Sequence, residues 1–243
     1  GIIFDKDGTL FDYYTVWSPV IRTALHEILI SLEKDKDEEM EKELLHLIGI
    51  GENDINPDGL IFIHNKSIAL INLFVFCKAN RIPYRRLVSG IFKRYYDSKS
   101  LLKESLLTNT DKDRLLPLFT KLKERGYTIG VVTSDNSTST KVCLEHFQID
   151  SYVSMISTYD DEYKRKPNPH SLKVFCKKFS IPPSEVVVVG DASVDMKYAK
   201  RGKAGYKIGV LTGSKNEKKL NEKADIVYPT IINLLHDKNL FTE

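Results

Sequence analysis

Two aspartates separated by one residue follow a short apolar run early in the sequence. Asp5 and Asp7 come directly after Ile2 to Phe4, and Gly8 and Thr9 follow them. β-Branched and aromatic residues favour a buried strand, and glycine permits the turn that must come next. Because open α/β sheets hold their ligands beyond the ends of strands, we expect both carboxylates to project into one crevice.

Three later strand ends carry polar residues of kinds that bind metals or phosphate. The predicted strands cover residues 127–133, 152–157 and 186–189. The polar residues at or after their ends are two hydroxyls, a lysine and a second pair of acids: Thr133, Ser134, Lys166, Asp191 and Asp195. The ends of parallel strands meet at one side of a sheet, so all of these groups are expected to converge with the first acid pair.

Four carboxylates at one place would repel one another and any anion. A hard cation relieves this repulsion, and Mg²⁺ prefers oxygen ligands. With all four aspartates ionised, Mg²⁺ and Lys166 leave one negative formal charge, and protonation of one aspartate removes it. Backbone N–H groups at the Asp5 and Ser134 loops add positive potential. A phosphoryl group fits such a site, because its oxygens accept metal, ammonium, hydroxyl and amide donors together.

Phosphoryl chemistry assigns different roles to the first two aspartates. A carboxylate can attack phosphorus and form an aspartyl-phosphate, and Asp5 lies closest to the strand end, which favours it as the fixed nucleophile. Asp7 is better placed to protonate the leaving oxygen and later to deprotonate the attacking water. This role needs a neutral Asp7 when the substrate arrives, so we expect like charge from its neighbours to raise the pKa of Asp7.

As a set, these residues resemble the motifs of the haloacid dehalogenase superfamily. The run Phe4-Asp5-Lys6-Asp7-Gly8-Thr9-Leu10 looks like its first motif, Thr133 its second, Lys166 before Pro167 its third, and Gly190-Asp191-Ala192-Ser193-Val194-Asp195 its fourth. The order and spacing match across nearly the whole predicted core. The combination is specific, although no single motif is. Within the superfamily, the chain looks most like the phosphoglycolate phosphatase-like group.

The resemblance implies a role for each matching residue. Asp5 would be the nucleophile and Asp7 the acid and base, while Thr133 and Lys166 would bind the phosphoryl group. Mg²⁺ would bind to Asp5, to the backbone carbonyl of Asp7 and to Asp191. The residues implied in supporting positions are Asp195, Gly8 and Thr9.

Several of these residues also have plainer interpretations. Ser134 could share the role of Thr133, and Lys164 or Arg165 could take the place of Lys166. Asp195 could serve only as an acid in the first turn of a helix, where a negative charge complements the helix dipole.

A long helical pattern without a convincing strand follows Asp12. Ser18-Pro19 predicts the first helix start, acidic residues within 35–39 begin a second helix, a third is expected over 66–79, and Pro83 opens a fourth. The segment Ser105 to Thr110 is interpreted as a return linker. We therefore expect an inserted all-helical domain over residues 13–106, similar to the type-I helical cap of the superfamily.

The rest of the chain alternates strands with helices, which predicts a doubly wound parallel sheet of the α/β class. Helices are expected over residues 113–125, 138–147, 169–179 and 194–200, with a last one after Thr230. Two more strands are expected over 206–210 and 226–228. The first strand belongs to this sheet, so the core domain comprises residues 1–12 and 107–243, with the Rossmann-like core of the superfamily.

Composition excludes some classes of partner. The net charge of +3 is small and the lysines are scattered, which does not indicate nucleic-acid binding. No apolar run approaches the roughly 18 residues of a membrane span. Cys77, Cys143 and Cys176 form no CxxC pair, so neither a zinc site nor a disulfide framework is predicted. The chain begins in a predicted strand rather than a signal peptide, and we expect a cytoplasmic protein.

These observations predict a Mg²⁺-dependent phosphatase that hydrolyses a small organic phosphate monoester through an aspartyl-phosphate on Asp5. The nearest alternative is a phosphomutase of the same fold, similar to β-phosphoglucomutase. A third interpretation is a non-catalytic binding or regulatory protein that keeps the fold. The intact set of Asp5, Asp7, Lys166 and Asp191 argues against that third interpretation.

Overall fold

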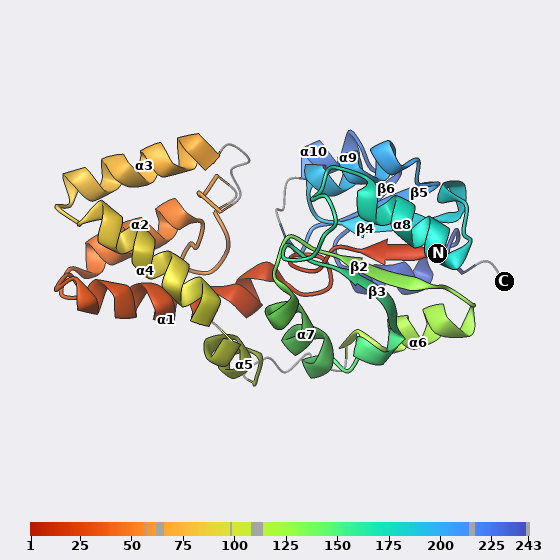
Figure 1. Cartoon of the computed structure of the whole chain (residues 1–243), viewed down its shortest axis with the longest axis horizontal. Helices are drawn as coiled ribbons and strands as arrows, with labels where there is room; N and C mark the ends of the chain where they lie inside the picture. The colour runs from red at the N-terminus through yellow and green to blue at the C-terminus, as the bar shows by residue number, and fades with distance from the viewer. Residues whose placement is uncertain (57, 62–65, 98, 108–113, 214–216, 242–243) are drawn as a thin grey trace. The chain divides into compact units, whose positions relative to one another are not determined.

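The protein divides into two compact units (Figure 1). The structure is a computed structural model that describes residues 1–56, 58–61, 66–97, 99–107, 114–213 and 217–241. One unit joins Gly1–Tyr13 to Asn109–Glu243, and the other is Tyr14–Thr108. In Figure 1 the red first strand lies among the green and blue strands of the later chain, so the first unit is built from both ends of the sequence.

A six-stranded sheet forms the centre of the first unit, in the order β3-β2-β1-β4-β5-β6. The strands are β1 (Ile2–Phe4), β2 (Ile129–Val132), β3 (Val153–Ser157), β4 (Val187–Gly190), β5 (Tyr206–Val210) and β6 (Ile226–Tyr228). Every neighbouring pair is parallel. The predicted doubly wound parallel sheet is therefore confirmed, and the predicted strands are all found within one or two residues of their expected bounds.

Helices cover both faces of this sheet. Ile3 packs in one core cluster with Leu172 and Phe175 of α8 (His170–Phe179), and α9 (Ser193–Gly202) contributes Tyr198 and Ala199 to the same cluster. Phe4 instead stacks on Phe119 of α6 (Leu116–Glu124), with 5.4 Å between ring centroids. Because successive strand residues point to opposite faces, α8 and α6 lie on opposite sides of β1. This two-sided burial explains the unbroken apolar run of the first strand.

The remaining helices of this unit differ in part from the prediction. α7 (Ser137–His146) lies within one residue of its expected bounds. A short helix, α10 (Glu217–Asn221), was not predicted, and the last helix after Thr230 is a 3₁₀-helix, Ile231–His236. Two further 3₁₀ turns, Asp150–Tyr152 and Pro183–Glu185, precede β3 and β4.

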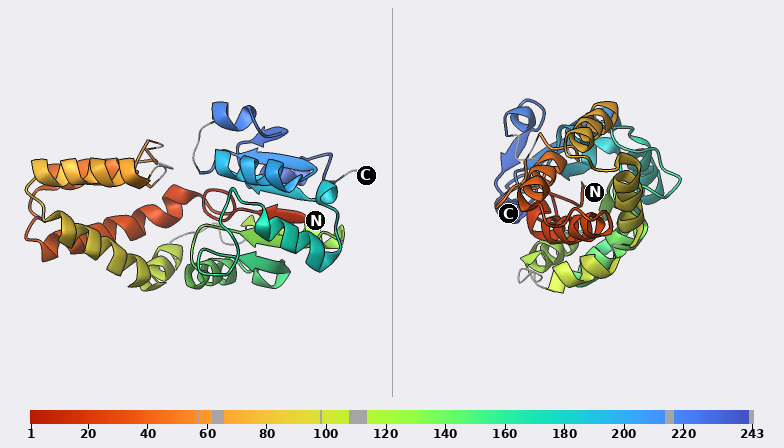
Figure 2. Two further views of the ribbon diagram at one scale, coloured as in Figure 1. Left: turned by 45° about the horizontal axis from the view of Figure 1, so that its top comes forward. Right: turned by 90° about the vertical axis from the view of Figure 1, so that its left-hand side faces the viewer.

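The described residues of the second unit form the helices α1 (Tyr13–Ser31), α2 (Glu38–Ile48), α3 (Lys66–Ala79), α4 (Tyr84–Asp97) and α5 (Lys99–Leu107). Asp37 caps the acidic start of α2, because its Oδ1 accepts a hydrogen bond from Met40 N at 3.0 Å. The expected bounds of α3 are confirmed. Figure 2 gives two further views of the chain, in which the helices of this unit run from red to yellow-green.

Two predictions about this unit were wrong. The helix expected to begin at Ser18-Pro19 begins at Tyr13, and Pro19 lies inside it. The first part of the expected linker, Ser105 to Leu107, is the last turn of α5, whereas residues 108–110 lie outside the described part of the chain. Within that described part, no helix combines the length and the apolar character that a membrane crossing requires.

Candidate active site

Asp5 lies at the point where the two central strands of the sheet end. It follows β1 directly, and its backbone N–H donates to Val189 O of β4 at 2.9 Å. β1 is flanked by β2 on one side and β4 on the other, so the chain order reverses here. Such a switch point, beyond the carboxyl ends of the strands, is where open α/β sheets bind ligands.

Lys166 connects acids from two distant loops. Its Nζ lies 2.5 Å from Asp5 Oδ1 and 2.6 Å from Asp195 Oδ1, and its side chain is only 5% exposed. Lys164 and Arg165 are exposed, and the Arg165 guanidinium lies over the ring of Tyr159 at 3.5 Å from its centroid. Of these three cations, Lys166 is therefore the one that the structure places against the Asp5 carboxylate.

Three carboxylates meet beside this lysine. Asp5, Asp191 and Asp195 each offer an oxygen, and these oxygens lie within 4.8 Å of one another. Thr9 Oγ1 donates to Asp191 Oδ1 at 3.3 Å, which steadies that carboxylate from the first loop. A cluster of carboxylate oxygens of this kind suits a hard divalent cation such as Mg²⁺. The residues present therefore fit the metal that the motifs imply.

The sequence left open whether Asp195 belongs to the site or only to the first turn of a helix, and its contacts show both. Its Oδ2 accepts from Ala192 N at 3.1 Å at the start of α9, while its Oδ1 contacts Lys166. The same side chain thus caps the helix and belongs to the acid cluster.

Glycines lie next to the acid cluster, at positions where a larger side chain would not fit. Gly8 has a φ of +79°, and a Cβ there would lie 2.6 Å from Gly213 Cα and 3.0 Å from Asp191. A Cβ at Gly213 would overlap Asp191 Oδ2, and one at Gly190 would overlap the Asp195 side chain. Gly213 was missed by sequence reasoning; the only available signal was its place shortly after the end of a predicted strand.

The two hydroxyl residues lie at the end of the neighbouring strand β2. Thr133 is buried, its N–H donates to Ser157 O at 2.9 Å, and its Oγ1 accepts from Asp135 N at 3.1 Å. Ser134 is exposed. β1 and β2 run in register, with Phe4 opposite Val131, so both strands deliver their polar ends to the same side of the sheet.

A second buried lysine lies between the first two aspartates. Lys6 is fully buried, and its Nζ lies 2.6 Å from Asp7 Oδ1 and 2.9 Å from Asp135 Oδ2. Sequence reasoning missed both Lys6 and Asp135, because a lysine between two aspartates in a turn reads as a solvated residue. The structure places the Lys6 ammonium next to Asp7, whereas we had expected like charge there; the rise in the pKa of Asp7 stays a prediction.

Burial and charge act against each other on these groups. Burial raises the pKa of Asp5; the Lys166 ammonium opposes that rise, and the Asp195 carboxylate adds to it. Burial alone would lower the pKa of Lys166, but the carboxylates of Asp195 and Asp5 hold that pKa above its usual range. In the same way, burial alone would lower the pKa of Lys6, which Asp7 and Asp135 hold above its usual range. Both ammonium groups thus stay charged.

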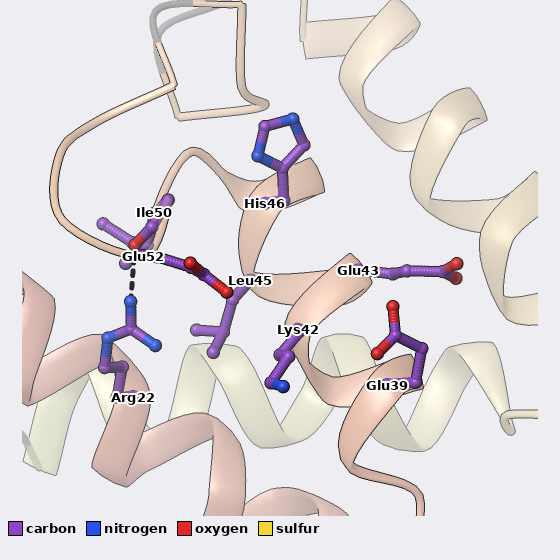
Figure 3. Close-up of a pocket in the computed structure, with 9 residues that line it drawn as sticks. Arg22, Glu39, Lys42, Glu43, Leu45, His46, Ile50 and Glu52 are labelled. Carbon is purple, nitrogen blue, oxygen red and sulfur yellow. Dashed lines mark hydrogen bonds between the residues drawn. The ribbon is translucent and has the colours of Figure 1, made fainter.

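A separate hollow of about 310 Å³ lies in the helical unit (Figure 3). Charged side chains of both signs line it, among them Arg22, Lys42 and Glu52. The Arg22 guanidinium is held in place, because Nη2 donates to Gly51 O at 2.5 Å and Nε donates to Ser18 Oγ at 3.1 Å. None of the predicted site residues lines this hollow.

Comparisons with known proteins agree with the fold and the motifs. The sequence model of the haloacid dehalogenase-like hydrolases matches residues 1–203, and the chain belongs to this family. The chain is also 26% identical to a phosphoglycolate phosphatase of Shigella boydii over 241 residues, which covers 97% of this chain and 90% of that protein. The resemblance that the motifs indicated is thus confirmed, and the protein is an enzyme of the hydrolase family.

Solved structures show the same fold. A superfamily hydrolase of subfamily IA from Geobacter sulfurreducens matches with a TM-score of 0.62 and 18% identity, over 97% of this chain and 94% of that one. A proposed β-phosphoglucomutase from Thermotoga maritima matches with a TM-score of 0.66 and 18% identity, over 97% of each chain. At this identity the two likenesses concern the fold alone.

Proposed function

We propose that the protein is a Mg²⁺-dependent phosphatase that hydrolyses a small organic phosphate monoester through an aspartyl-phosphate on Asp5. The observation that supports this most directly is the meeting of Asp5, Asp191 and Asp195 beside the ammonium of Lys166. Acids from two loops far apart in the sequence are brought to one point at the end of β1. A binding protein without chemistry would have no need of so costly a cluster of buried charge.

The chain's own residues supply both halves of the reaction. An Asp5 carboxylate oxygen attacks phosphorus and forms the new P–O bond, while the bond to the leaving oxygen breaks and Asp7 gives that oxygen a proton. Water then attacks the aspartyl-phosphate, Asp7 takes the proton from this water, and inorganic phosphate leaves Asp5. Lys166 offsets the negative charge of the transferred group, and Thr133 and Ser134 offer hydroxyl donors to its oxygens.

Mg²⁺ would be held by Asp5, the Asp7 backbone carbonyl and Asp191, with Asp195 in support. When bound, it would neutralise charge on the phosphoryl oxygens and hold the phosphoryl group in line with Asp5. Gly8 and Thr9 keep the first loop close to Asp191, as described above. The helical unit would act as a cap that excludes bulk water and selects the leaving group.

The test is the release of inorganic phosphate from p-nitrophenyl phosphate with Mg²⁺ and with a chelator. The Asp5→Asn variant should fold normally and lose turnover by a factor of about 10⁴ or more, because it removes the nucleophile. Lys164→Met, two residues from Lys166 but exposed, is the matched control and should keep full activity. Normal turnover in Asp5→Asn would remove the nucleophile assignment.

The physiological substrate and the mutase alternative need a second assay. The similarity to phosphoglycolate phosphatases makes 2-phosphoglycolate the first substrate to try, followed by a panel of phosphorylated metabolites. A phosphomutase would instead convert β-glucose 1-phosphate into a second sugar phosphate without net loss of phosphate. Stoichiometric release of inorganic phosphate from every substrate that reacts supports the phosphatase.

A further inference from the structure

Lys6 is the centre of a buried ion-pair cluster that joins two loops of the α/β unit. One partner, Asp7, lies on the loop after β1; the other, Asp135, lies between β2 and α7. The exposed fraction of the side chain is 0% for Lys6, 6% for Asp135 and 18% for Asp7. The ammonium is therefore cut off from water, and of the three side chains only Asp7 retains an appreciable exposed fraction.

Asp135 is itself held firmly. Ser139 Oγ donates to Asp135 Oδ2 and Asn136 N donates to Asp135 Oδ1, both at 2.7 Å. The Asp135 backbone N–H donates to Thr133 Oγ1, and its carbonyl accepts from Tyr159 N at 2.8 Å. These bonds fix Asp135 to the start of α7 and to the loop after β3. A group that binds Asp135 is therefore held at a fixed position relative to the sheet.

The surroundings of Lys6 indicate that its charge orients the neighbouring carboxylates more than it stabilises the fold. Its Nζ lies 4.0 Å from Cys143 Sγ and 5.8 Å from the ring centroid of Phe11, so low-polarity groups also lie beside the ammonium. A buried ion pair of this kind contributes little net stability compared with apolar packing, because both charges lose their hydration. What it does provide is a fixed direction for each carboxylate that it binds.

We propose that Lys6 is a positioning residue that holds the Asp7 carboxylate in place for proton transfer by bracing it against Asp135. This inference rests on the proposed function, in which Asp7 gives a proton to the leaving oxygen. It also assigns a task to Asp135, which links the loop of the two aspartates to the loop of Thr133. Without Lys6, the Asp7 side chain would lose the bond at Oδ1 that fixes its direction.

The test removes both Lys6 and the charge of Asp135, because Lys6→Met alone would remove the cation that lies between Asp7 and the buried Asp135. The double variant Lys6→Met/Asp135→Asn removes both buried charges and should fold. Its kcat for p-nitrophenyl phosphate should fall by about 10- to 100-fold, while KM changes little, because the base that takes the proton from the attacking water is displaced and substrate binding is not. The matched control is Lys141→Met/Glu145→Gln, which removes an exposed ion pair of α7 and should leave kcat unchanged.

Asp135→Asn alone provides a second variant, because it keeps the Lys6–Asp7 bond and loses only the charged anchor. Its kcat should fall less than that of the double variant. A folded double variant with the kcat of the wild type overturns the positioning role, and so does an Asp135→Asn variant that loses more activity than the double variant.

Crystal structures of the wild type and the double variant separate this inference from the proposed function. If the wild type hydrolyses no phosphate ester, the proposed function fails, yet the position of Asp7 still decides the role of Lys6. A shifted or disordered Asp7 side chain in the double variant supports the brace. An Asp7 carboxylate that keeps its wild-type position, or a wild type in which Lys6 Nζ does not contact Asp7, overturns it.

Discussion

Two buried lysines each contact two carboxylates of the site. Lys166 binds Asp5 and Asp195, and Lys6 binds Asp7 and Asp135. The Lys6 ammonium and the Asp135 carboxylate cancel each other in the formal charge of the site. The charge expected from the sequence therefore still holds, although two of the groups that set it were not anticipated.

The acid cluster was predictable from the sequence because its members follow apolar runs that can only be strands. Lys6 was not, because its partner Asp135 lies on another loop and becomes a neighbour only when β1 pairs with β2. The role of Gly213 was not predicted for the same reason, because its approach to Asp191 depends on how three loops pack. Local patterns identify the chemistry, and long-range packing decides which groups hold it in place.

Gly213→Ala should weaken Mg²⁺ binding, because the new Cβ would overlap Asp191 Oδ2 and displace that carboxylate. We expect the affinity for Mg²⁺ to fall by about 10- to 100-fold, as for other changes that misplace a metal ligand. The measurement is a calorimetric titration with MgCl₂. Gly126→Ala is the control: it also replaces a glycine with alanine, here at a positive φ, but nothing lies within 4 Å of its Cβ. It should cost about 1 kcal/mol of stability and leave Mg²⁺ affinity unchanged.

At the scale of elements, the strands were predicted better than the helix ends. The strands of the sheet are short apolar runs with turns on both sides, and each run can pair in few ways. Pro19 misled the prediction because proline is common in the first turn of a helix, whereas here α1 begins six residues earlier. No helix was predicted over α5, and Ser105 was interpreted as the start of a linker, although the leucines, lysines and glutamate of this stretch favour a helix.

Asp160 ties the loop after β3 to the start of α7. It accepts from Ser137 N at 2.8 Å and from Ser137 Oγ at 2.7 Å, and Thr158 Oγ1 donates to the same carboxylate at 2.8 Å. Burial alone would raise the pKa of Asp160, but these hydrogen bonds hold that pKa below its usual range. Its contribution to stability is therefore complete above the pKa of an unfolded aspartate and is lost as the pH falls through the lower, folded value.

Asp160→Ala should lower the free energy of unfolding by about 1 kcal/mol at pH 7, because it removes the acceptor for Ser137 and Thr158 while Asn136 still caps α7. The difference from the wild type should shrink as the pH falls below 4, because the wild-type carboxylate then becomes protonated as well. Urea unfolding at a series of pH values measures both effects. If the difference in unfolding free energy between the two proteins stays constant down to the lowest pH at which both fold, the charge of Asp160 does not contribute to stability.

At the scale of the whole molecule, the chain has one unit built from both ends of the sequence and one built from its middle. The insertion was visible in the sequence, because a long helical stretch without strands separates the first strand from the second. What the sequence could not supply is the substrate, since no residue pattern of the helical stretch indicates a particular leaving group.

In the proposed function the acid cluster binds Mg²⁺ only when it is folded, so Mg²⁺ should raise the thermal stability of the α/β unit. At one hundred times its Kd, the ion should add about 2.7 kcal/mol to the free energy of unfolding. Circular dichroism melts with MgCl₂, and with NaCl at equal ionic strength, measure the effect. In Asp191→Asn the rise should be lost, and an equal rise in that variant would mean that the ion binds elsewhere.

The central place of β1 in the sheet has a consequence for how the protein is made. Ile2 pairs with Ile129 on one side and with Val187 on the other, so β1 is made well before either of the strands that flank it. The helical unit lies between β1 and β2 in the sequence, so it is made before β1 can pair. β1 is therefore an apolar strand without its partners while the helical stretch is made, and an unpaired apolar strand is prone to aggregation.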